Sequence, residues 1–483
     1  MAQKYILLVM TVLLAAINAR YTHSSLAVRY LRNAMEAAAA GSPMVTEIIL
    51  REYYISQPKL EVVRDIAAIA PDLFLGSVYI WNAEFFSAIM PDIKALLPGC
   101  KLILGGPEAD SRPEHWLNGH PELDILVQGQ AEGFALMLGK AQFNTATFSG
   151  RLVKAPPVHF ADTAFPYSEK DFLDLEKRYL YYESSRGCPF RCSYCLSARE
   201  DQRLDEKDAE TVIGELEKIA LHEPFLVKFV DRSFNAKPDR AREIWRYLIN
   251  AHGSKRTRWH FELHPLLLEE EDFALLAMAP EALFQFELGV QTVNEAGRSA
   301  VDRAGNWPKE KGALVRLIGM KKAHIHLDLI AGLPGEDLDR VAISFNELME
   351  LEPDHIQLGF LKGLPSTPLR DRADLAYREE RVNSPDWAVF QSMPPYEVLR
   401  TSFLSSDELG MLKGMEKLVD SLYNSGRFMA DMKAFSKQYG SYFSAYLAVY
   451  SYCAKTGFDL RTRDKAKLEL MLAGFKASFS SNS

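Results

Sequence analysis

Apolar and polar stretches alternate along the first third of the chain in a pattern that predicts strands and helices in turn. Continuous apolar runs of about five or six residues are typical of buried parallel strands. The stretches between them carry apolar residues at helical spacing, and such alternation predicts a parallel sheet with right-handed crossovers. The expected strands are Thr11–Ile17, Val45–Leu50, Leu73–Val78, Lys101–Leu104 and Asp124–Val127. The expected helices are Ser25–Ala40, Lys59–Ala70, Ala83–Leu97 and Ala131–Leu138.

The first apolar run is longer than one strand requires. Tyr5–Ala16 follows a short charged start and superficially resembles a signal peptide, but the run is too short to span a bilayer. We favour a buried strand from Thr11 to Asn18 that is preceded by an extension. Met10 is then a candidate translation start.

The middle of the chain repeats the strand–helix alternation, and the last part is helical. Six strand-like runs separated by helical stretches predict a partial (βα)6 barrel. Leucine, methionine, phenylalanine and tyrosine at helical spacing predict an all-helical C-terminal cap over the barrel mouth. The predicted α/β architecture therefore has three domains, at residues 1–165, 173–395 and 396–483. The six strand-like runs are Leu180–Ser184, Phe225–Val230, Arg258–Leu263, Leu283–Val290, Ile325–Ile330 and His355–Leu361.

The net charge and the cysteine content limit which binding partners and which cellular compartment are expected. The 483 residues carry a formal net charge of −8, which argues against a general nucleic-acid surface or an anionic-membrane surface. With five cysteines in this length no disulfide framework is implied, and a reducing cytoplasm is the expected location.

The most informative motif is a CxxxCxxC run formed by Cys188, Cys192 and Cys195. Three thiolates fill three of the four iron corners of a 4Fe–4S cluster and leave one iron open to a small chelating molecule. A structural zinc site is the alternative, but zinc normally takes four nitrogen or sulfur ligands, often as two CxxC pairs. The sequence has no second pair, so the spacing favours an iron–sulfur cluster.

This motif, with Tyr194 directly before the last cysteine, resembles the signature of the radical S-adenosylmethionine (AdoMet) superfamily. The resemblance implies that the open iron binds the amino and carboxylate groups of AdoMet, with Tyr194 among the AdoMet contacts. It also implies that the reduced cluster cleaves AdoMet to a 5'-deoxyadenosyl radical. The six βα units would then form the partial barrel of that superfamily.

Three further segments resemble AdoMet contacts of this superfamily. Asp231 and Ser233 follow the second barrel strand, where cobalamin-dependent members often carry an acidic residue; a strand-ending turn is the alternative. Gln291 ends a Gly-Val-Gln element similar to that of oxygen-independent coproporphyrinogen oxidase relatives. Arg303 occupies the position that pairs with the AdoMet carboxylate in those relatives, and its alternative is a surface arginine. Gly332 begins a Gly-Leu-Pro-Gly-Glu turn that passes beside adenine.

The first domain resembles the cobalamin-binding domain that precedes many radical AdoMet cores. The resemblance rests on Gly-Gly-Pro-Glu after the fourth strand and Gly-Gln-Ala-Glu-Gly after the fifth. It implies a Rossmann-like (flavodoxin-like) fold that binds cobalamin beyond the carboxyl ends of its strands. The candidate cobalamin contacts are Tyr21, His23, Ser24, Ser77, Gly105, Gly106, Gly129 and Glu132.

The loop after the first strand departs from the cobalamin pattern. Cobalamin domains of the methyltransferase–mutase kind carry Asp-x-His-x-x-Gly there, whereas this chain has Tyr21 at the Asp position and Leu26 at the Gly position. His23 lacks the carboxylate that normally orients a metal-bound imidazole. It is therefore either a cobalt ligand or a hydrogen-bonding residue of the loop.

The order of domains resembles a bacterial group of cobalamin-binding radical AdoMet proteins with an uncharacterised helical C-terminal domain. The leading interpretation is an enzyme that receives an electron from a flavodoxin- or ferredoxin-type donor and methylates an unactivated carbon of a small molecule. No residue identifies that substrate. The alternatives are a cyclase or rearranging enzyme without methyl transfer, a tRNA methylthiotransferase, and a non-enzymatic cobalamin or iron–sulfur sensor. The methylthiotransferase would need a second cluster and an RNA-binding tail, and a sensor would not need Gln291 and Arg303.

Overall fold

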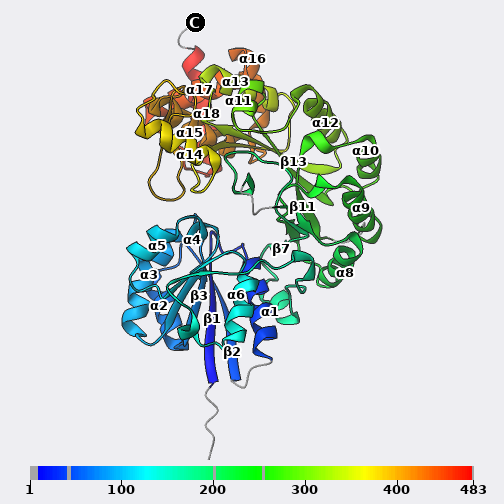
Figure 1. The fold of residues 1–483 in the computed structure, drawn as a ribbon. Coiled ribbons are helices and arrows are strands. Elements are labelled where there is room, and N and C mark those ends of the chain that lie inside the picture. The colour runs from blue at the N-terminus through cyan, green and yellow to red at the C-terminus, as the bar shows by residue number, and fades with distance from the viewer. Residues whose placement is uncertain (1–8, 41–44, 199–202, 253–255, 481–483) are drawn as a thin grey trace, which may run out of the picture. The chain divides into compact units, whose positions relative to one another are not determined.

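The computed structural model of the chain describes residues 9–40, 45–198, 203–252 and 256–480. It divides into two compact units. The first unit contains Met1–Arg186 and Asp205–Val230, and the second contains Gly187–Leu204 and Asp231–Ser483. Figure 1 follows the chain by colour from the first unit to the C-terminal helices. The domain boundaries predicted from the sequence stay predictions.

A parallel six-stranded sheet forms the core of the first unit, in the order β2-β1-β3-β4-β5-β6 (Figure 1). Strand β1 is interior to the sheet, which explains its continuous apolar run and confirms the predicted strand. The short strand β6 escaped the sequence prediction. The strands are β1 (Val9–Asn18), β2 (Val45–Tyr54), β3 (Leu73–Ser77), β4 (Lys101–Gly105), β5 (Ile125–Gln128) and β6 (Leu152–Lys154).

Helices cover both faces of this sheet, as the flavodoxin-like prediction requires. Alternate residues of β1 point to opposite faces: Leu13 packs in one apolar cluster with α2 (Lys59–Ile69) and α3 (Ala83–Leu96). Leu14 packs in a second cluster with α1 (Leu26–Ala39) and α6 (Ala131–Lys140). The short helices α4 (Pro107–Ser111) and α5 (Pro113–Gly119) follow β4.

All six strands predicted for the barrel form. Strands β7 and β10 pair in parallel within the first unit, and the order β14-β13-β12-β11 is parallel within the second. The strands are β7 (Leu180–Tyr182), β10 (Leu226–Phe229), β11 (Arg258–Leu263), β12 (Phe284–Gln291), β13 (Ala323–Ala331) and β14 (His355–Phe360). The helices among them are α8 (Ala209–Ala220), α9 (Pro238–His252), α10 (Glu270–Ala277), α11 (Glu295–Ala300), α12 (Trp307–Gly319) and α13 (Leu338–Met349).

Strand β12 has one apolar face and one polar face. Its buried residues alternate with half-buried ones along the whole strand. Phe286 lies on the buried face, and its ring centroid is 6.0 Å from that of Trp245 in α9. This face therefore packs on the helices, and Gln285, Glu287 and Gln291 lie on the opposite face.

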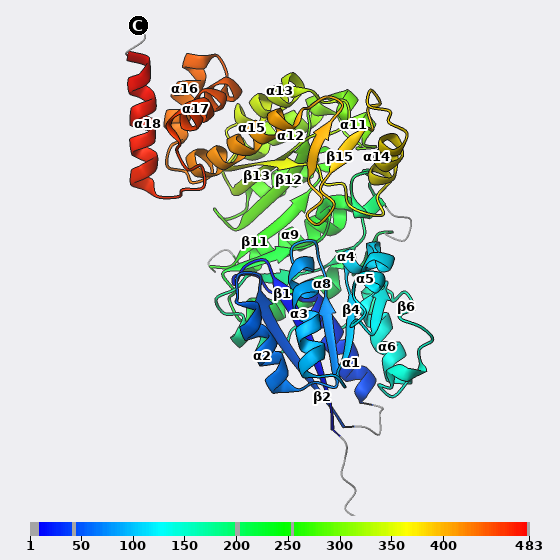
Figure 2. The same cartoon turned by 90° about the vertical axis from the view of Figure 1, so that its left-hand side faces the viewer.

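The C-terminal part is helical, as predicted, and its described contacts run along α13 and the edge strand β14. Tyr446 packs on Phe345 of α13 with ring centroids 5.6 Å apart. The Asn424 amide accepts from the Ile356 N–H at 3.0 Å and donates to the Ile356 carbonyl at 2.9 Å. This pairing satisfies backbone groups that an exposed edge strand would leave open. Figure 2 shows the helices α15 (Ser406–Leu418), α16 (Met429–Tyr439), α17 (Tyr442–Thr456) and α18 (Lys465–Ser480).

A short strand pair and a short helix were not predicted. After α14 (Pro368–Arg378), strands β15 (Ala388–Phe390) and β16 (Val398–Thr401) form an antiparallel pair. Helix α7 (Glu169–Asp174) follows the first sheet. No helix among the described residues has the length and apolar character needed to cross a membrane.

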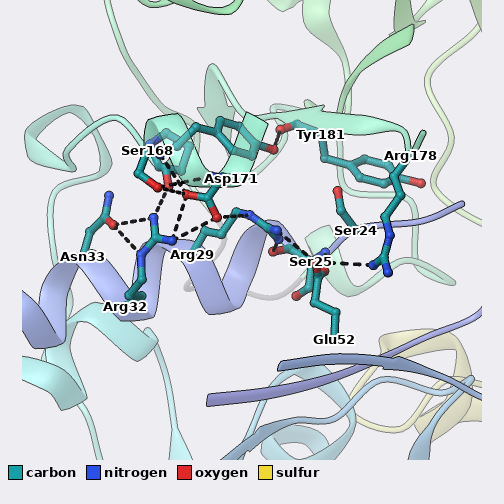
Figure 3. Close-up of polar contacts among 12 residues, drawn as sticks. Ser24, Ser25, Arg29, Arg32, Asn33, Glu52, Ser168, Asp171, Arg178 and Tyr181 are labelled. Atoms are coloured by element: carbon teal, nitrogen blue, oxygen red, sulfur yellow. Dashed lines mark hydrogen bonds and ion pairs between the residues drawn. The ribbon is translucent and has the colours of Figure 1, made fainter. Parts of the chain in front are cut away.

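A buried ion-pair network joins α1, β2 and α7 in the first unit (Figure 3). The Arg29 side chain is 2% exposed, and its guanidinium lies 2.9 Å from Glu52 and 3.1 Å from Asp171. Arg32 approaches the same Asp171 carboxylate at 2.8 Å. Burial opposes ionisation of Asp171, but hydrogen bonds from Ser168 and the two arginine charges hold its pKa below the usual range.

Replacing Arg29 by alanine should lower the free energy of unfolding of the first unit by about 3 kcal/mol, because Glu52 and Asp171 would lose the buried cation that they share and keep only Arg178 and Arg32. Urea unfolding of the full chain followed by circular dichroism measures this loss. Arg51→Ala is the control, since its pair with Asp65 has side chains 45% and 47% exposed and should contribute less than about 1 kcal/mol. Equal losses in both variants would contradict the prediction.

Candidate functional site

The three cysteines of the CxxxCxxC motif lie in one loop of the second unit. Cys188 and Cys192 are 8% and 7% exposed, whereas Cys195 is less buried. Burial raises the pKa of the Cys188 thiol, and the neighbouring Cys195 and Cys192 raise it further. Three cysteine thiols that interact electrostatically in a partly buried loop fit an iron–sulfur cluster, because bound iron would stabilise their thiolate form.

Backbone hydrogen bonds hold this loop in place. The Ser193 N–H donates to the Val301 carbonyl at 2.9 Å, and the Ser193 carbonyl accepts from the Leu369 N–H at 2.9 Å. The Ser197 N–H lies 3.4 Å from the Cys195 sulfur and donates to it. These hydrogen bonds position the loop from both sides.

Arg303 reaches the cysteine loop from the segment after α11. One Nη atom lies 3.8 Å from the Cys192 sulfur, and the other donates to the Gly289 carbonyl. The Arg303 Nε is buried, and among the described residues it has no hydrogen-bond partner. A buried N–H of a guanidinium beside the cysteines fits a carboxylate ligand, because arginine offers forked donors of matching geometry.

Gln291 has a strained backbone at the end of β12. Its φ is 69°, a left-handed value that is rare for a non-glycine residue, and the pairing of β12 with β13 shifts between Gly289 and Gln291. A Cβ added to Gly289 would lie 2.3 Å from the Gln291 Nε2 and 3.9 Å from an Arg303 Nη. The Gln291 and Arg303 side chains therefore both lie beside Gly289, and Arg303 also reaches Cys192. Their contacts with AdoMet stay predictions. Such strain is typical of functional sites.

The remaining predicted AdoMet contacts are distributed around the loop. Asp231 is fully buried, and the Ser233 hydroxyl lies 3.7 Å from the Cys188 sulfur. Burial raises the pKa of Tyr194, and the Arg303 charge opposes this. Gly332 has a φ of 93°, and an added Cβ would lie 2.8 Å from Val398 in β16. The packing of β16 alone explains this glycine, so its place beside adenine stays a prediction.

Sequence reasoning missed His264, which follows β11 directly. The residue is 4% exposed, and its ring stacks on Phe190 of the cysteine loop with centroids 4.2 Å apart. The Asn235 side chain holds the His264 backbone through two hydrogen bonds, at 2.9 and 3.0 Å. Burial lowers the pKa of His264 to about 4, and the Arg303 charge adds to this, so the ring is neutral at pH 7. Its place at the carboxyl end of a barrel strand was the available signal.

The predicted cobalamin contacts of the first unit lie along one edge of its sheet. Ser77 ends β3, Gly105 ends β4 and Gly129 follows β5, and the carboxyl ends of parallel strands share one edge. Gly106 has a φ of 101°, and an added Cβ would lie 2.6 Å from the Val78 carbonyl oxygen. Glycine is required there for backbone approach between neighbouring loops.

His23, in the loop after β1, forms a hydrogen bond with Tyr181 of β7 that the sequence did not reveal. The His23 Nδ1 lies 2.6 Å from the Tyr181 hydroxyl, and the tautomer decides which atom donates. Burial lowers the pKa of His23, and the charges of Lys228 and Arg20 lower it further. The neutral imidazole thus has a hydrogen-bond partner on Nδ1, and the role of His23 as a cobalt ligand stays a prediction.

The other predicted contacts near that loop have separate roles in the structure. The Ser24 hydroxyl donates to the Tyr179 carbonyl at 2.7 Å. Tyr21 is 50% exposed, with the Arg178 guanidinium 4.6 Å from its ring centroid. Glu132 forms an ion pair with Arg186 at 2.6 Å. Contacts of these three residues with cobalamin stay predictions.

Comparisons with known families agree with both resemblances. Residues 12–136 match the B12 binding domain, and residues 182–348 match the radical SAM superfamily. The chain carries a B12-binding domain and a radical SAM domain. Residues 387–483 match a third family, described as a protein of unknown function, DUF4080. The radical SAM domain includes the cysteine loop, Gln291 and Arg303, and the B12-binding domain includes the glycine-rich strand ends.

Two curated relatives that the chain matches are described as methyltransferases. A 2-(S-pantetheinyl)-carbapenam-3-carboxylate methyltransferase of Streptantibioticus cattleyicolor is 24% identical over 397 residues, covering 73% of this chain and 57% of the relative. The cobalamin-dependent radical SAM methyltransferase TokK of Streptomyces tokunonensis is 24% identical over 341 residues, covering 62% of this chain and 48% of the relative. The chain spans about half the length of these curated relatives.

The fold resembles that of a solved enzyme over almost the whole chain. The apo structure of the cobalamin-dependent S-adenosylmethionine radical enzyme OxsB aligns with a TM-score of 0.68 at 14% identity, covering 98% of this chain and 76% of that chain. At this identity the likeness shows the shared fold alone.

Gly106→Ala should destabilise the strand-end loop by about 1–3 kcal/mol, because φ is left-handed and the new Cβ would collide with the Val78 backbone. The thermal unfolding midpoint of the full chain measures the loss. Gly105→Ala is the matched control: its Cβ would lie 3.5 Å from Val127, an ordinary contact. A midpoint that falls no further in Gly106→Ala than in the control would refute the prediction.

Proposed function

We propose that the protein is a cobalamin-dependent radical AdoMet enzyme that methylates an unactivated carbon of a small molecule. The observation that supports this most is the Arg303 guanidinium beside Cys192, whose Nε has no hydrogen-bond partner among the described residues; the Gln291 side chain lies with Arg303 beside Gly289. The two domain matches add independent support.

The proposal assigns specific tasks to the residues of the second unit. Cys188, Cys192 and Cys195 hold a 4Fe–4S cluster with one open iron. Arg303 binds the AdoMet carboxylate through its free Nε–H, and Gln291 orients the same molecule. The bound cofactors supply radical cleavage of AdoMet and a transferable methyl group, and the protein supplies position and exclusion of water.

Asp231, Ser233 and the neutral His264 complete the proposed AdoMet surface. Asp231 and His264 are buried and lie in loops after neighbouring barrel strands in the chain. A carboxylate suits the AdoMet amino group or ribose, and a neutral imidazole suits a hydrogen bond without added charge. In the first unit, the glycines at the strand ends and the His23–Tyr181 pair form the proposed cobalamin surface.

Radical SAM enzymes generally need a reductant, and we propose a flavodoxin- or ferredoxin-type protein as the electron donor. The net charge of −8 gives no support to nucleic acid or an anionic membrane as a partner. We propose the cytoplasm as the location, because a reducing compartment suits five cysteines without a disulfide framework.

Anaerobic purification and reconstitution with iron and sulfide should test the cofactor set. We expect a 4Fe–4S absorption band, bound corrinoid, and 5'-deoxyadenosine that forms only with AdoMet and a reductant. Cys188→Ala should lose the cluster and the cleavage product together. Cluster and AdoMet cleavage without any bound corrinoid would overturn the methyl-transfer proposal. A product without an added carbon would favour a cyclase or rearranging enzyme instead.

Arg303→Lys should weaken AdoMet binding by about tenfold, because lysine keeps the charge but lacks the forked donors for a carboxylate. Equilibrium dialysis of AdoMet against the reconstituted protein measures this, with iron content checking the cluster. Arg316→Lys is the control, since Arg316 pairs with the exposed Glu270 outside this site. Unchanged AdoMet affinity in Arg303→Lys would remove Arg303 from the proposed site.

A further inference from the structure

The polar face of strands β11–β14 carries acidic and histidine side chains that the AdoMet site does not use. The parallel register aligns four of them in one row across the four strands: Glu262, Glu287, His326 and His355. Asp328 lies two residues beyond His326 and therefore on the same face of β13. The interiors of βα barrels are usually filled by layers of branched apolar side chains. A row of ionisable side chains in place of apolar ones indicates that this face binds a ligand.

The side chains converge on a small volume. Glu287, His326 and Asp328 each offer one atom such that all three atoms lie within 4.8 Å of one another. The His326 Nδ1 is 3.7 Å from the Glu287 Oε2, and the His326 Nε2 is 3.0 Å from the Asp328 Oδ1. Two ligand atoms bound to one tetrahedral metal ion at 2.0–2.2 Å lie about 3.4 Å apart. An ion would take one imidazole nitrogen: the His326 Nε2 lies 3.0 Å from the Asp328 Oδ1, close to that value, and the three ligand atoms together lie within 4.8 Å of one another.

The surroundings favour a cation between these groups. The side chains of Glu287, His326 and Asp328 are 25%, 17% and 14% exposed, so water screens their charges only in part. Two carboxylates that share a partly buried site repel each other, and a bound cation removes that repulsion.

Two further histidines lie beside the Glu287–His326–Asp328 group. The His260 Nε2 lies 3.3 Å from the Glu287 Oε2, and the His355 ring centroid is 4.2 Å from that of His326. Such imidazoles can orient the ligands next to a bound metal ion through hydrogen bonds.

We propose that Glu287, His326 and Asp328 bind a divalent transition-metal ion on the polar face of the barrel sheet, separate from the cysteine cluster. A set of two carboxylates and one imidazole suits Zn²⁺, Mn²⁺ or Fe²⁺. This is the single grouping of its kind among the residues that the structure describes. The inference does not rest on AdoMet cleavage or on cobalamin binding.

Zinc retention by the reconstituted full-length protein tests the site. With the cluster assembled anaerobically, the protein is equilibrated with Zn²⁺, passed through a desalting column and assayed for zinc and iron. We expect one zinc per chain in addition to the cluster iron. Glu287→Gln, His326→Gln and Asp328→Asn should each weaken zinc binding by about tenfold or more. Gln357→Ala is the matched control, because Gln357 is exposed, pairs with Asp328 across the strands and is not a proposed ligand.

Two results would overturn the metal site. One is wild-type protein that retains no zinc beyond background, which would mean that the three side chains share protons without a metal. The other is zinc that is retained equally by the wild type and the three variants, which would mean adventitious surface binding. Unchanged cluster iron and thermal midpoint identify variants that have folded. Because the readout is zinc, a protein that binds zinc but does not cleave AdoMet would refute the proposed function alone.

Discussion

The guanidinium of Arg303, with its buried Nε, is the constraint that links the cysteine loop to the end of β12. It contacts Cys192 and the Gly289 carbonyl, next to the irregular pairing where Gln291 has a left-handed conformation. The buried ion pair of Arg298 with Glu310 positions the segment that carries Arg303. Arg298 makes two hydrogen bonds of 2.7 Å with Glu310, and the Arg298 carbonyl accepts from the Arg303 N–H at 3.0 Å. Arg303 is thus fixed through its backbone as well as its side chain.

Both cofactor surfaces use the same property of parallel sheets. Carboxyl ends of neighbouring strands meet at one edge, so short loops that are distant in sequence become neighbours there. In the first unit this gathers glycines and a histidine, and at Gly106 the missing side chain lets the loop pack against the Val78 backbone. In the second unit the corresponding loops carry charged and polar side chains around three thiols. The chemistry differs because the loops differ, while the arrangement of strands is alike.

Much of the fold was predictable because it depends on local apolar patterns. Every strand predicted for the two sheets forms, whereas β6, with only three residues, gave too little periodicity to detect. A motif and a fixed spacing also singled out the cysteines and Arg303, which lie close together at Cys192. The pairing of His23 with Tyr181 was not predictable, because the two residues are 158 positions apart in the chain. The Glu287–His326–Asp328 group likewise acquires its meaning only from strand register.

The path of the chain between the two units has a practical consequence. The backbone passes from one unit to the other after Arg186, returns after Leu204 and leaves again after Val230. Neither unit is therefore encoded by one uninterrupted stretch of the gene. A fragment that stops before the cysteines would lack α8 and β10, and β7 would lose its hydrogen-bonded neighbour. Dissecting this protein into halves at a single cut site should yield incomplete pieces, and a circular permutation or a co-expressed insert would be needed to obtain either unit intact.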